Sequence, residues 1–349
     1  MSRRAGYSGP MGARGRLGRL VFGAMAAEAV FTAVRLRIAD LIGDEQRDGT
    51  QLAAETGTDV GALTRLLRAL AALDLMSEPA PAQFRLTEAG QLLRSDHPDS
   101  MHAFVRTFGD PTMLRAWREL GTAVRSGEST YDKVNGASLF EYLASNPEVL
   151  QLFTATMRQG TVLTGQQLVC TYDVNPVRTV ADVGGGDGTL LAALLKAHPH
   201  LRGILFDTAD GLTGADRALG DAGVADRCEC RAGDFFAGAP EGADLYMLKS
   251  VLRGWDDARA GTILAHIRAV IPDAGRLLII EPVLPDIADG SLPATVYLGD
   301  LNLLVSAGTR LRSLSDYERL CERTGFTLRT VTRLPLPFDF SVLEAAPTQ

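Results

Sequence analysis

The sequence predicts two domains, a helical N-terminal domain followed by a doubly wound α/β domain. Its 349 residues are 46% hydrophobic and 22% charged, which is enough apolar material for two hydrophobic cores. Up to residue 157 the apolar positions follow helical spacing, whereas after residue 178 short apolar strands alternate with helices. We place the boundary in the 158–178 region and expect a tail over 1–19, the helical domain over 20–165 and the α/β domain over 166–349.

Successive helices are predicted at the start of the N-terminal domain. Residues 1–19 carry five arginines, several glycines and no acid, so we expect a flexible tail there. The apolar positions from Leu20 to Ile42 predict one buried or partner-facing helix that ends at Gly43. Thr50 is expected to cap a short helix that runs through Thr56, and Asp59 is expected to cap a longer one.

A helix, a turn, a second helix and a β-wing follow one another in this domain, an order that resembles a winged helix. Phe84–Thr87 is the predicted strand of the wing. The apolar face of the second helix comprises Leu63, Leu66, Leu67, Leu70 and Leu73. Only Arg65 and Arg68 are basic on this helix, so we expect a role in dimerisation or packing rather than DNA reading.

Composition limits the compartment and the partners. A net charge of −7 and a pI near 5.4 argue against binding to nucleic acid, so a small ligand is expected. The four cysteines are too scattered for a disulfide framework, which indicates a reducing cytoplasm. The apolar run Leu20–Val34 contains Glu28 and is followed by Arg35, so we expect it to be too short and too polar to span a membrane.

Strand candidates dominate the second half of the chain. They are Thr179–Val183, Gly203–Asp207, Cys228–Ala232, Ala243–Lys249 and Arg276–Glu281. Helices separate most of these strands, which predicts a doubly wound and largely parallel sheet. Thr327–Arg333 and Phe340–Glu344 are expected to close the sheet as an antiparallel hairpin.

The stretch Val180–Leu191 reads V-A-D-V-G-G-G-D-G-T-L-L and has the form of a strand, a glycine turn and a helix start. Gly184, Gly186 and Gly188 permit positive φ angles and the close approach of a ligand, while the N–H groups of the helix start point toward it. The stretch fits a dinucleotide fingerprint only loosely, because the third glycine of that fingerprint falls on Thr189. A purely structural turn is the alternative, but the neighbouring aspartates favour a nucleotide-like ligand.

Further candidate ligand-binding residues follow the other strands at the same edge of the predicted sheet. Asp207 ends the second strand, where a carboxylate can accept hydrogen bonds from ribose hydroxyls. Asp234 and Phe235 follow the third strand and suit the amine and the flat face of adenine. Asp182 precedes the glycine turn, and the segment 249–257 follows the fourth strand. Asp207 as a helix cap and Phe235 as a core aromatic are the alternatives, but the ordered set favours a nucleotide site.

These motifs together resemble the two-domain, S-adenosylmethionine-dependent O-methyltransferases of secondary metabolism, of the caffeate and polyketide type. The resemblance extends from the Leu20 helix to Glu344 and rests on D-V-G-G-G-D-G, G-D-F-F, L-K-S-V-L-R-G-W-D-D, G-R-L-L-I-I-E-P-V-L-P and L-F-E-Y-L-A-S-N-P-E. It implies S-adenosyl-L-methionine or its product S-adenosyl-L-homocysteine as the cofactor and a small natural product as the acceptor. It also implies a Rossmann-like class I methyltransferase domain and a cytoplasmic homodimer formed through an all-helical winged-helix domain.

The resemblance assigns individual residues to the cofactor and the acceptor. The cofactor-binding residues that it implies are Thr161, Asp182, Gly184, Gly186, Asp207, Asp234, Phe235, Lys249 and Trp255. The acceptor-binding residues that it implies are Phe153, Met157 and Asn302.

The sequence departs from this family at the catalytic base. Arg253 occupies the position of the family's histidine, and Gly254 that of the acidic residue that often follows it. Of the two glutamates that usually orient the histidine, one is retained as Glu281 and the other falls on Leu311. Because a guanidinium stays protonated at any working pH, Arg253 cannot take a proton from a phenol as imidazole does.

Three functional hypotheses follow from Arg253 and Glu281. In the first, the chain transfers a methyl group and Arg253 stabilises a phenolate, enolate or carboxylate of the acceptor. In the second, the fold is repurposed for decarboxylation, hydroxylation or cyclisation, with Arg253 polarising a carbonyl. In the third, the chain is a catalytically silent binding partner in which Arg253 pairs with Glu281. The retained cofactor residues favour the first two hypotheses, and we predict a methyltransferase with an unusual acid–base apparatus.

His102, Tyr297 and Asp300 are the candidate substitute bases, although ordinary packing or surface positions also explain each of them. No cluster of His and carboxylate residues has metal-ligand spacing, so we expect no divalent metal.

Overall fold

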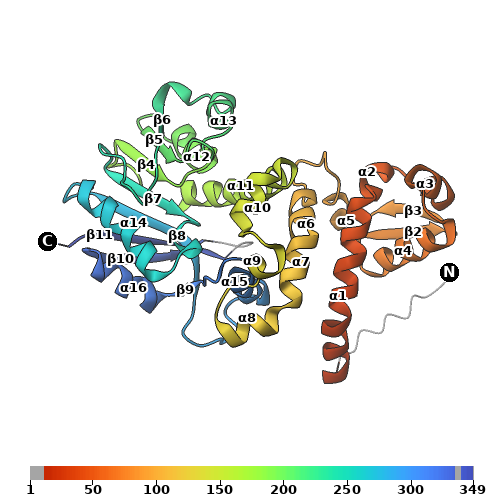
Figure 1. Cartoon of the computed structure of the whole chain (residues 1–349). Helices are drawn as coiled ribbons and strands as arrows, with labels where there is room; N and C mark the ends of the chain where they lie inside the picture. The colour runs from red at the N-terminus through yellow and green to blue at the C-terminus, as the bar shows by residue number, and fades with distance from the viewer. Residues whose placement is uncertain (1–11, 335–338, 349) are drawn as a thin grey trace. The chain divides into compact units, whose positions relative to one another are not determined.

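The computed structural model describes residues 12–334 and 339–348, which form two compact units (Figure 1). The first unit extends to Leu114 and includes Pro147–Thr156. The second comprises Arg115–Asn146 and the chain from Met157 onward. The domain boundary that we predict between residues 165 and 166 falls inside one long helix, α11 (Pro147–Thr171), and it stays a prediction.

Helices and a small three-stranded sheet make up the first unit. Its elements are α1 (Ala13–Arg35), α2 (Ile38–Ile42), β1 (Arg47–Asp48), α3 (Gly49–Thr56), α4 (Val60–Ala72), β2 (Met76–Ala80), β3 (Gln83–Leu86), α5 (Glu88–Gln91) and α6 (His102–Phe108), with parts of α7 (Pro111–Arg118) and α11. The three strands pair antiparallel in the order β1-β3-β2. The expectation of an all-helical domain is therefore corrected in this respect, whereas the strand predicted near Phe84 is confirmed as β3.

The single helix predicted over Leu20–Ile42 is wrong, because the structure contains two helices there. Arg37 adopts a left-handed conformation with φ 55°, which ends α1 and lets the chain turn into α2. The start of α1 at Ala13 also corrects the predicted tail, since residues 13–19 are helical. Residues 1–11 of that tail lie outside the described residues.

Aspartate side chains cap the two following helices. The Oδ1 atom of Asp48 accepts a hydrogen bond from the backbone N–H of Thr50 at 2.8 Å, so Asp48 caps α3 and the predicted cap at Thr50 is wrong. The predicted cap at Asp59 is confirmed, because its Oδ1 atom accepts from Ala62 N at 2.8 Å. Leu63, Leu67 and Leu70 of α4 are buried, together with Ile38, Leu52 and Phe84.

The apolar side chains of α1 remain largely uncovered within this chain. Leu17, Leu20, Val21, Phe22 and Met25 are all exposed. An 18-residue window of this 23-residue helix has a mean hydropathy of 1.5, so by length and composition alone α1 could cross a membrane. The helix is longer than the run Leu20–Val34 for which we expect no membrane span, and that expectation stays a prediction. A signal sequence near an N-terminus or an apolar helix covered by protein meets the same criteria.

The second unit is built around one large sheet. Its helices are the rest of α7 and α11, α8 (Leu120–Ser126), α9 (Tyr131–Asn135), α10 (Leu139–Ser145), α12 (Thr189–Ala197), α13 (Ala215–Asp221), η1 (Ala225–Arg227), η2 (Leu252–Gly254), α14 (Asp257–Val270), α15 (Ala294–Ala307) and α16 (Leu314–Arg323). Its strands are β4 (Thr179–Val183), β5 (Arg202–Asp207), β6 (Cys228–Ala232), β7 (Leu245–Lys249), β8 (Arg276–Leu284), β9 (Arg312–Ser313), β10 (Phe326–Arg333) and β11 (Phe340–Pro347).

The strand order is β10-β11-β8-β7-β4-β5-β6, with β9 pairing with β8. The strands from β4 to β8 pair in parallel, while β11 runs antiparallel to both β8 and β10. The predicted parallel sheet and its closing hairpin are thus confirmed. Because β4 lies between β5 and β7, the chain leaves in opposite directions on its two sides, and ligands bind at such a switch point.

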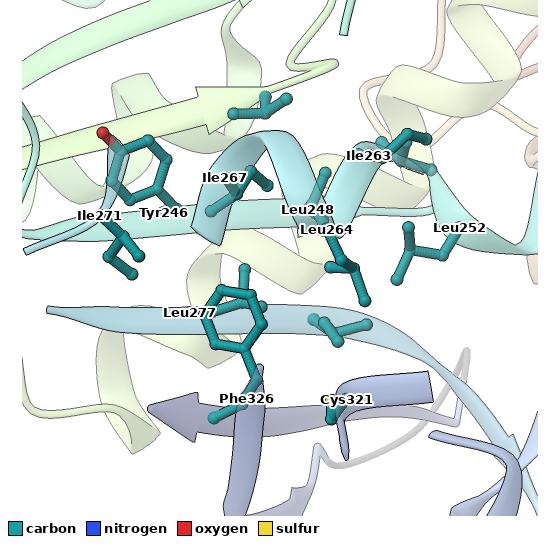
Figure 2. Packing of buried hydrophobic residues seen from close by; sticks show 14 of the residues in the cluster. Tyr246, Leu248, Leu252, Ile263, Leu264, Ile267, Ile271, Leu277, Cys321 and Phe326 are labelled. Carbon is teal, nitrogen blue, oxygen red and sulfur yellow. The ribbon is translucent and has the colours of Figure 1, made fainter. Parts of the chain in front are cut away.

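Side chains that alternate along the strands divide the core into two layers. On one face Tyr246 and Leu248 of β7 pack with Ile263, Leu264 and Ile267 of α14 (Figure 2). On the other face the intervening residues, such as Leu245 and Met247, pack with the leucines of α12. Burial on both faces explains why the central strand β7 is largely apolar until Lys249, where it leaves the sheet.

Candidate active site

The glycine turn lies between the end of β4 and the start of α12. Gly184, Gly186 and Gly188 all have positive φ angles, of 73°, 58° and 77°. A β-carbon on Gly184 would lie 2.8 Å from Cγ2 of Val251, so that position also requires glycine for lack of space. A β-carbon on Gly186 would meet no atom within 4 Å among the described residues, which leaves open space beside the turn.

Two aspartates define the polar side of this turn. The Oδ2 atom of Asp207 accepts a hydrogen bond from Gly186 N at 2.9 Å, and its Oδ1 atom accepts from Thr208 N at 2.7 Å. Asp182 is 1% exposed, and within the described parts of the chain its Oδ2 atom has no hydrogen-bond partner. Burial, followed by the negative charge of Asp207, raises the pKa of Asp182 to about 7.

Aromatic rings form a wall after β6 and η2. The ring of Phe236 lies 4.9 Å from that of Phe235 and 4.8 Å from that of Trp255, in both cases edge to face. The Arg259 guanidinium stacks 4.3 Å from both Phe236 and Trp255. The Oδ1 atom of Asp234 accepts from Phe236 N at 2.8 Å, which fixes the turn that presents these rings.

Lys249 ends β7 and connects the sheet to α11. Its Nζ atom donates to Oγ1 of Thr161 at 2.9 Å, and that hydroxyl donates in turn to the carbonyl of Met157 at 2.8 Å. The Lys249 ammonium also lies 5.1 Å from the centre of the Phe340 ring. Burial, followed by the nearby Arg253 guanidinium, lowers the pKa of Lys249 to about 8.

Arg253 and Glu281 meet next to this lysine. The Nε atom of Arg253 lies 3.7 Å from Oε2 of Glu281, and the backbone N–H of Arg253 donates to Oε1 of the same carboxylate at 3.3 Å. Glu281 is completely buried, whereas the Arg253 side chain retains 23% exposure. Burial raises the pKa of Glu281, and the Arg253 guanidinium opposes that effect. The pair therefore presents a cation on the open side of a buried acid.

The residues predicted to bind the acceptor lie on two elements, α11 and α15. Met157 lies one helical turn before Thr161. Asn302 of α15 accepts a hydrogen bond through Oδ1 from Nε1 of Trp117 at 2.8 Å. Phe153 belongs to the other compact unit, so its place in the site stays a prediction.

Asp300, Tyr297 and His102 are the candidate substitute bases, and in the part of the chain that the structure describes none of them is hydrogen-bonded or ion-paired to Arg253 or Glu281. The Oδ1 atom of Asp300 accepts from Leu311 N at 2.6 Å, and the Leu311 side chain is buried. The hydroxyl of Tyr297 has no hydrogen-bond partner among the described residues, and His102 lies on α6 in the first unit. Over residues 12–334 and 339–348 no three His, Cys, Asp or Glu side chains are arranged to hold a metal ion.

Several residues near the site escaped the sequence analysis. Phe340 lies beneath Lys249 and, at 5.9 Å, beneath Arg253, although it comes from the distant strand β11. Arg158 of α11 approaches Asp187 of the glycine turn, with 3.6 Å between Nε and Oδ2. Arg312 is buried beside η2. Only contacts between distant segments reveal these residues, and no local pattern marks them.

The residues present fit S-adenosyl-L-methionine. The unpartnered carboxylate oxygen of Asp182 and the open space at Gly186 suit its charged methionine part. Asp207 has lone pairs left for ribose hydroxyls beyond its two backbone bonds, and the rings of Phe235 and Trp255 suit adenine. When bound, this cofactor supplies an electrophilic methyl group on a sulfonium sulfur.

Comparisons with known proteins agree with this fit. Residues 117–327 match the family model of the O-methyltransferase domain, and residues 19–96 match that of the O-methyltransferase dimerisation domain. O-demethylpuromycin-O-methyltransferase from Streptomyces alboniger is 44% identical over 98% of this chain and 92% of its own length. The solved structure of the mitomycin 7-O-methyltransferase MmcR has a TM-score of 0.89 and 32% identity, covering 96% of this chain and 98% of that one.

A solved structure with bound ligands is also similar. The O-methyltransferase NcsB1 from neocarzinostatin biosynthesis, in complex with S-adenosylmethionine and 2-hydroxy-5-methyl naphthoic acid, has a TM-score of 0.78 and 31% identity over 92% of this chain and 95% of that one. The cofactor bound in this similar structure is thus the one that the residues around the glycine turn fit. This chain belongs to the O-methyltransferase family and is an S-adenosylmethionine-dependent methyltransferase with an N-terminal dimerisation domain.

Proposed function

We propose that this enzyme methylates a hydroxyl oxygen of a small aromatic natural product, and that Arg253 stabilises the oxyanion of that acceptor. The observation that carries the proposal is the pair of Arg253 and Glu281 at the carboxyl edge of the sheet. The guanidinium is half-buried against a fully buried acid, so it is held in place while its open side can still meet an anion. Similarity to enzymes named for aromatic and puromycin-type acceptors supports the acceptor class.

The steps assigned to the protein are binding and orientation. Asp182, Asp207 and the Phe235 ring hold the cofactor, and the Lys249–Thr161 contact fixes α11 against the end of the sheet. An acceptor that is already ionised, or that loses its proton to water, needs no protein base for in-line transfer. Arg253 then lowers the pKa of the bound hydroxyl by pairing with its oxyanion. The similarity to O-methyltransferases supports methyl transfer rather than decarboxylation or cyclisation.

The proposal is tested with phenols of graded acidity. The purified enzyme is incubated with S-adenosylmethionine that carries a trideuteriomethyl group, and the product mass is followed. We expect a gain of one labelled methyl group and an apparent pKa of kcat/KM that moves with the pKa of the phenol. An apparent pKa fixed near 8 for every phenol would assign the proton to Lys249 and contradict the role of Arg253. Conversion without the label would exclude methyl transfer.

Variants at Arg253 distinguish the contribution of its positive charge from that of its planar, fixed geometry. Arg253→Met should lower kcat by about 10²- to 10³-fold, as expected for the loss of one oxyanion-stabilising group. Arg253→Lys should retain part of that activity, because the charge remains but the planar fork is lost. Arg253→His combined with Leu311→Glu asks whether the family's usual base can be rebuilt. Wild-type kcat in Arg253→Met would refute the assigned role.

We also propose that the protein is a cytoplasmic homodimer in which a second copy covers the apolar face of α1. The face comprises Leu17, Leu20, Val21, Phe22 and Met25. Most of α1 falls within residues 19–96, which match the dimerisation domain. Exposed apolar patches of this kind mark interaction surfaces. The winged-helix description of this domain is proposed on the same basis, from the hairpin β2–β3 that follows α3 and α4.

A further inference from the structure

Arg312 is a cation in the interior of the second unit. Its side chain is 1% exposed, and it is the largest fully buried side chain in the described part of the chain. The residue begins β9 and pairs with Val283 of β8, two positions after Glu281. A buried guanidinium is costly unless its donors are used, so its partners indicate its role.

The side chain of Arg312 donates three hydrogen bonds to the segment 252–257, which carries Arg253. Its Nη1 atom donates to the carbonyl of Leu252 at 2.7 Å, and its Nη2 atom donates to the carbonyl of Trp255 at 2.8 Å. Its Nε atom donates to Oδ1 of Asp257 at 2.9 Å. The two carbonyls lie on either side of Arg253 and Gly254, so the guanidinium is hydrogen-bonded to both ends of the η2 turn.

Apart from Arg312, the buried Leu252 side chain and a few backbone hydrogen bonds fix this turn. The backbone N–H of Arg253 donates to Glu281 Oε1 at the long distance of 3.3 Å. Within η2 itself, Gly254 N donates to Val251 O at 3.1 Å. A three-residue turn has little internal stability, because such helices satisfy few of their own carbonyl groups. Leu252 anchors the start of the turn in the core. Arg312 holds the two carbonyls on either side of Arg253, and Glu281 contacts the Arg253 side chain.

We propose that Arg312 is a positioning residue for methyl transfer, which holds the η2 turn so that the Arg253 guanidinium meets the acceptor's oxyanion. This inference rests on the proposed role of Arg253. The planar fork of Arg312 spans the two carbonyls and the carboxylate at once. A lysine ammonium is a single point donor and cannot span all three. The charge alone is thus insufficient for this role.

If the η2 turn becomes less ordered, the aromatic rings of Phe235, Phe236 and Trp255 should keep their positions better than the Arg253 side chain does. The Trp255 ring is also held by Phe236 at 4.8 Å and by the Arg259 guanidinium at 4.3 Å. The Arg253 side chain has Glu281 at 3.7 Å and the Phe340 ring at 5.9 Å. Loss of the hydrogen bonds of Arg312 should therefore lower kcat and leave the affinity for the cofactor nearly unchanged.

The experiment compares Arg312→Lys with Arg310→Lys. Arg310 is an exposed neighbour that contacts Asp316 at 2.7 Å and the same Asp257 at 3.8 Å, so it is a matched control. We expect Arg312→Lys to lower kcat by about 10- to 100-fold, the scale of a displacement of about 1 Å. The dissociation constant of S-adenosylhomocysteine, measured by calorimetry, should change by less than about threefold. Arg310→Lys should keep both values.

A double-mutant cycle with Arg253→Met identifies the route of the effect. If Arg312 acts through Arg253, Arg312→Lys should cost less than about twofold in the Arg253→Met background. Effects that multiply in the double variant overturn the inference. So does wild-type kcat in Arg312→Lys when Arg253→Met is impaired, whereas wild-type kcat in Arg253→Met overturns the proposed function itself.

A second variant covers the case in which Arg312→Lys fails to fold, as judged by circular dichroism. Asp257→Asn removes the negative charge that orients the guanidinium, and the Asp257 side chain is half-exposed, so folding should survive. We expect kcat to fall by about 3- to 10-fold, again without effect in the Arg253→Met background. An unchanged kcat in Asp257→Asn would overturn the positioning role and leave Arg312 as a purely structural residue.

Discussion

Replacing Asp182 by asparagine should flatten the dependence of stability on pH in the ligand-free enzyme. The Asp182 carboxyl is buried, and its pKa is about 7 in the folded chain against an ordinary value of 3.8. As the pH rises from about 4 to about 7, the unfolded chain loses this proton while the folded chain retains it. The contribution of the protonated Asp182 carboxyl to the free energy of unfolding is therefore present at low pH and is lost as the pH rises through 7. The pKa difference corresponds to about 4 kcal/mol.

Asparagine has the shape of aspartate without its charge, so it removes this loss. Its amide N–H₂ introduces buried donors, and leaving them unpaired costs about 1–3 kcal/mol. The variant should consequently exceed the wild type by about 1–3 kcal/mol above pH 8 and show no advantage near pH 5.

Urea denaturation followed by circular dichroism, at several values between about pH 5 and about pH 8.5, measures this difference. Asp226→Asn, at an exposed position in η1, is the control and should leave the profile unchanged. A difference between Asp182→Asn and the wild type that stays constant across the pH range would refute the reasoning, because no uptake of a proton by Asp182 could then be linked to folding.

The remaining predictions concern the cofactor, the dimer and the acid. Trp255→Leu should weaken S-adenosylhomocysteine binding by about tenfold in calorimetry, since it removes the stacking surface shared with Phe236; unchanged affinity would argue against an adenine site there. Phe22→Glu places a charge on the exposed apolar face of α1 and should give a monomer in size-exclusion chromatography with light scattering, whereas a persistent dimer would show that another surface is used. Glu281 has a raised pKa, so its protonation at falling pH should release Arg253 and reduce kcat. This decrease of kcat at low pH should disappear in Glu281→Gln. If the decrease persists in that variant, it belongs to another titrating group.

The sequence was sufficient for the sheet and for the polar residues at its edge. Thr179–Val183 was located to the residue because its largely apolar, β-branched run ends where the chain leaves the sheet. Cys228–Ala232 was located because its two cysteines alternate with charged residues, as on one face of a strand. Asp207 and Phe235 could be placed together because parallel strands end at one edge.

Other features depend on information that local patterns do not contain. A left-handed arginine at position 37 is uncommon for a residue with a β-carbon, so the break between α1 and α2 had no signal. The arginine-rich residues 13–19 read as a tail by composition, although they form the first turns of α1. The partners of Arg312 and the contact between Lys249 and Thr161 join segments far apart in the chain, so only the fold brings them together.

The place of β11 in the sheet also affects how the enzyme is made. Ser341 of β11 pairs with Glu281, and the neighbouring Phe340 lies beneath Lys249 and Arg253. A ribosome adding 5–20 residues per second reaches Ser341 about 3–12 seconds after Glu281. During that interval the nascent chain carries β8 with an unpaired edge and a carboxylate that is not yet enclosed. The edge of β8 can therefore pair with β11, and the Glu281 carboxylate can be enclosed, only after the last residues of the sheet have been made.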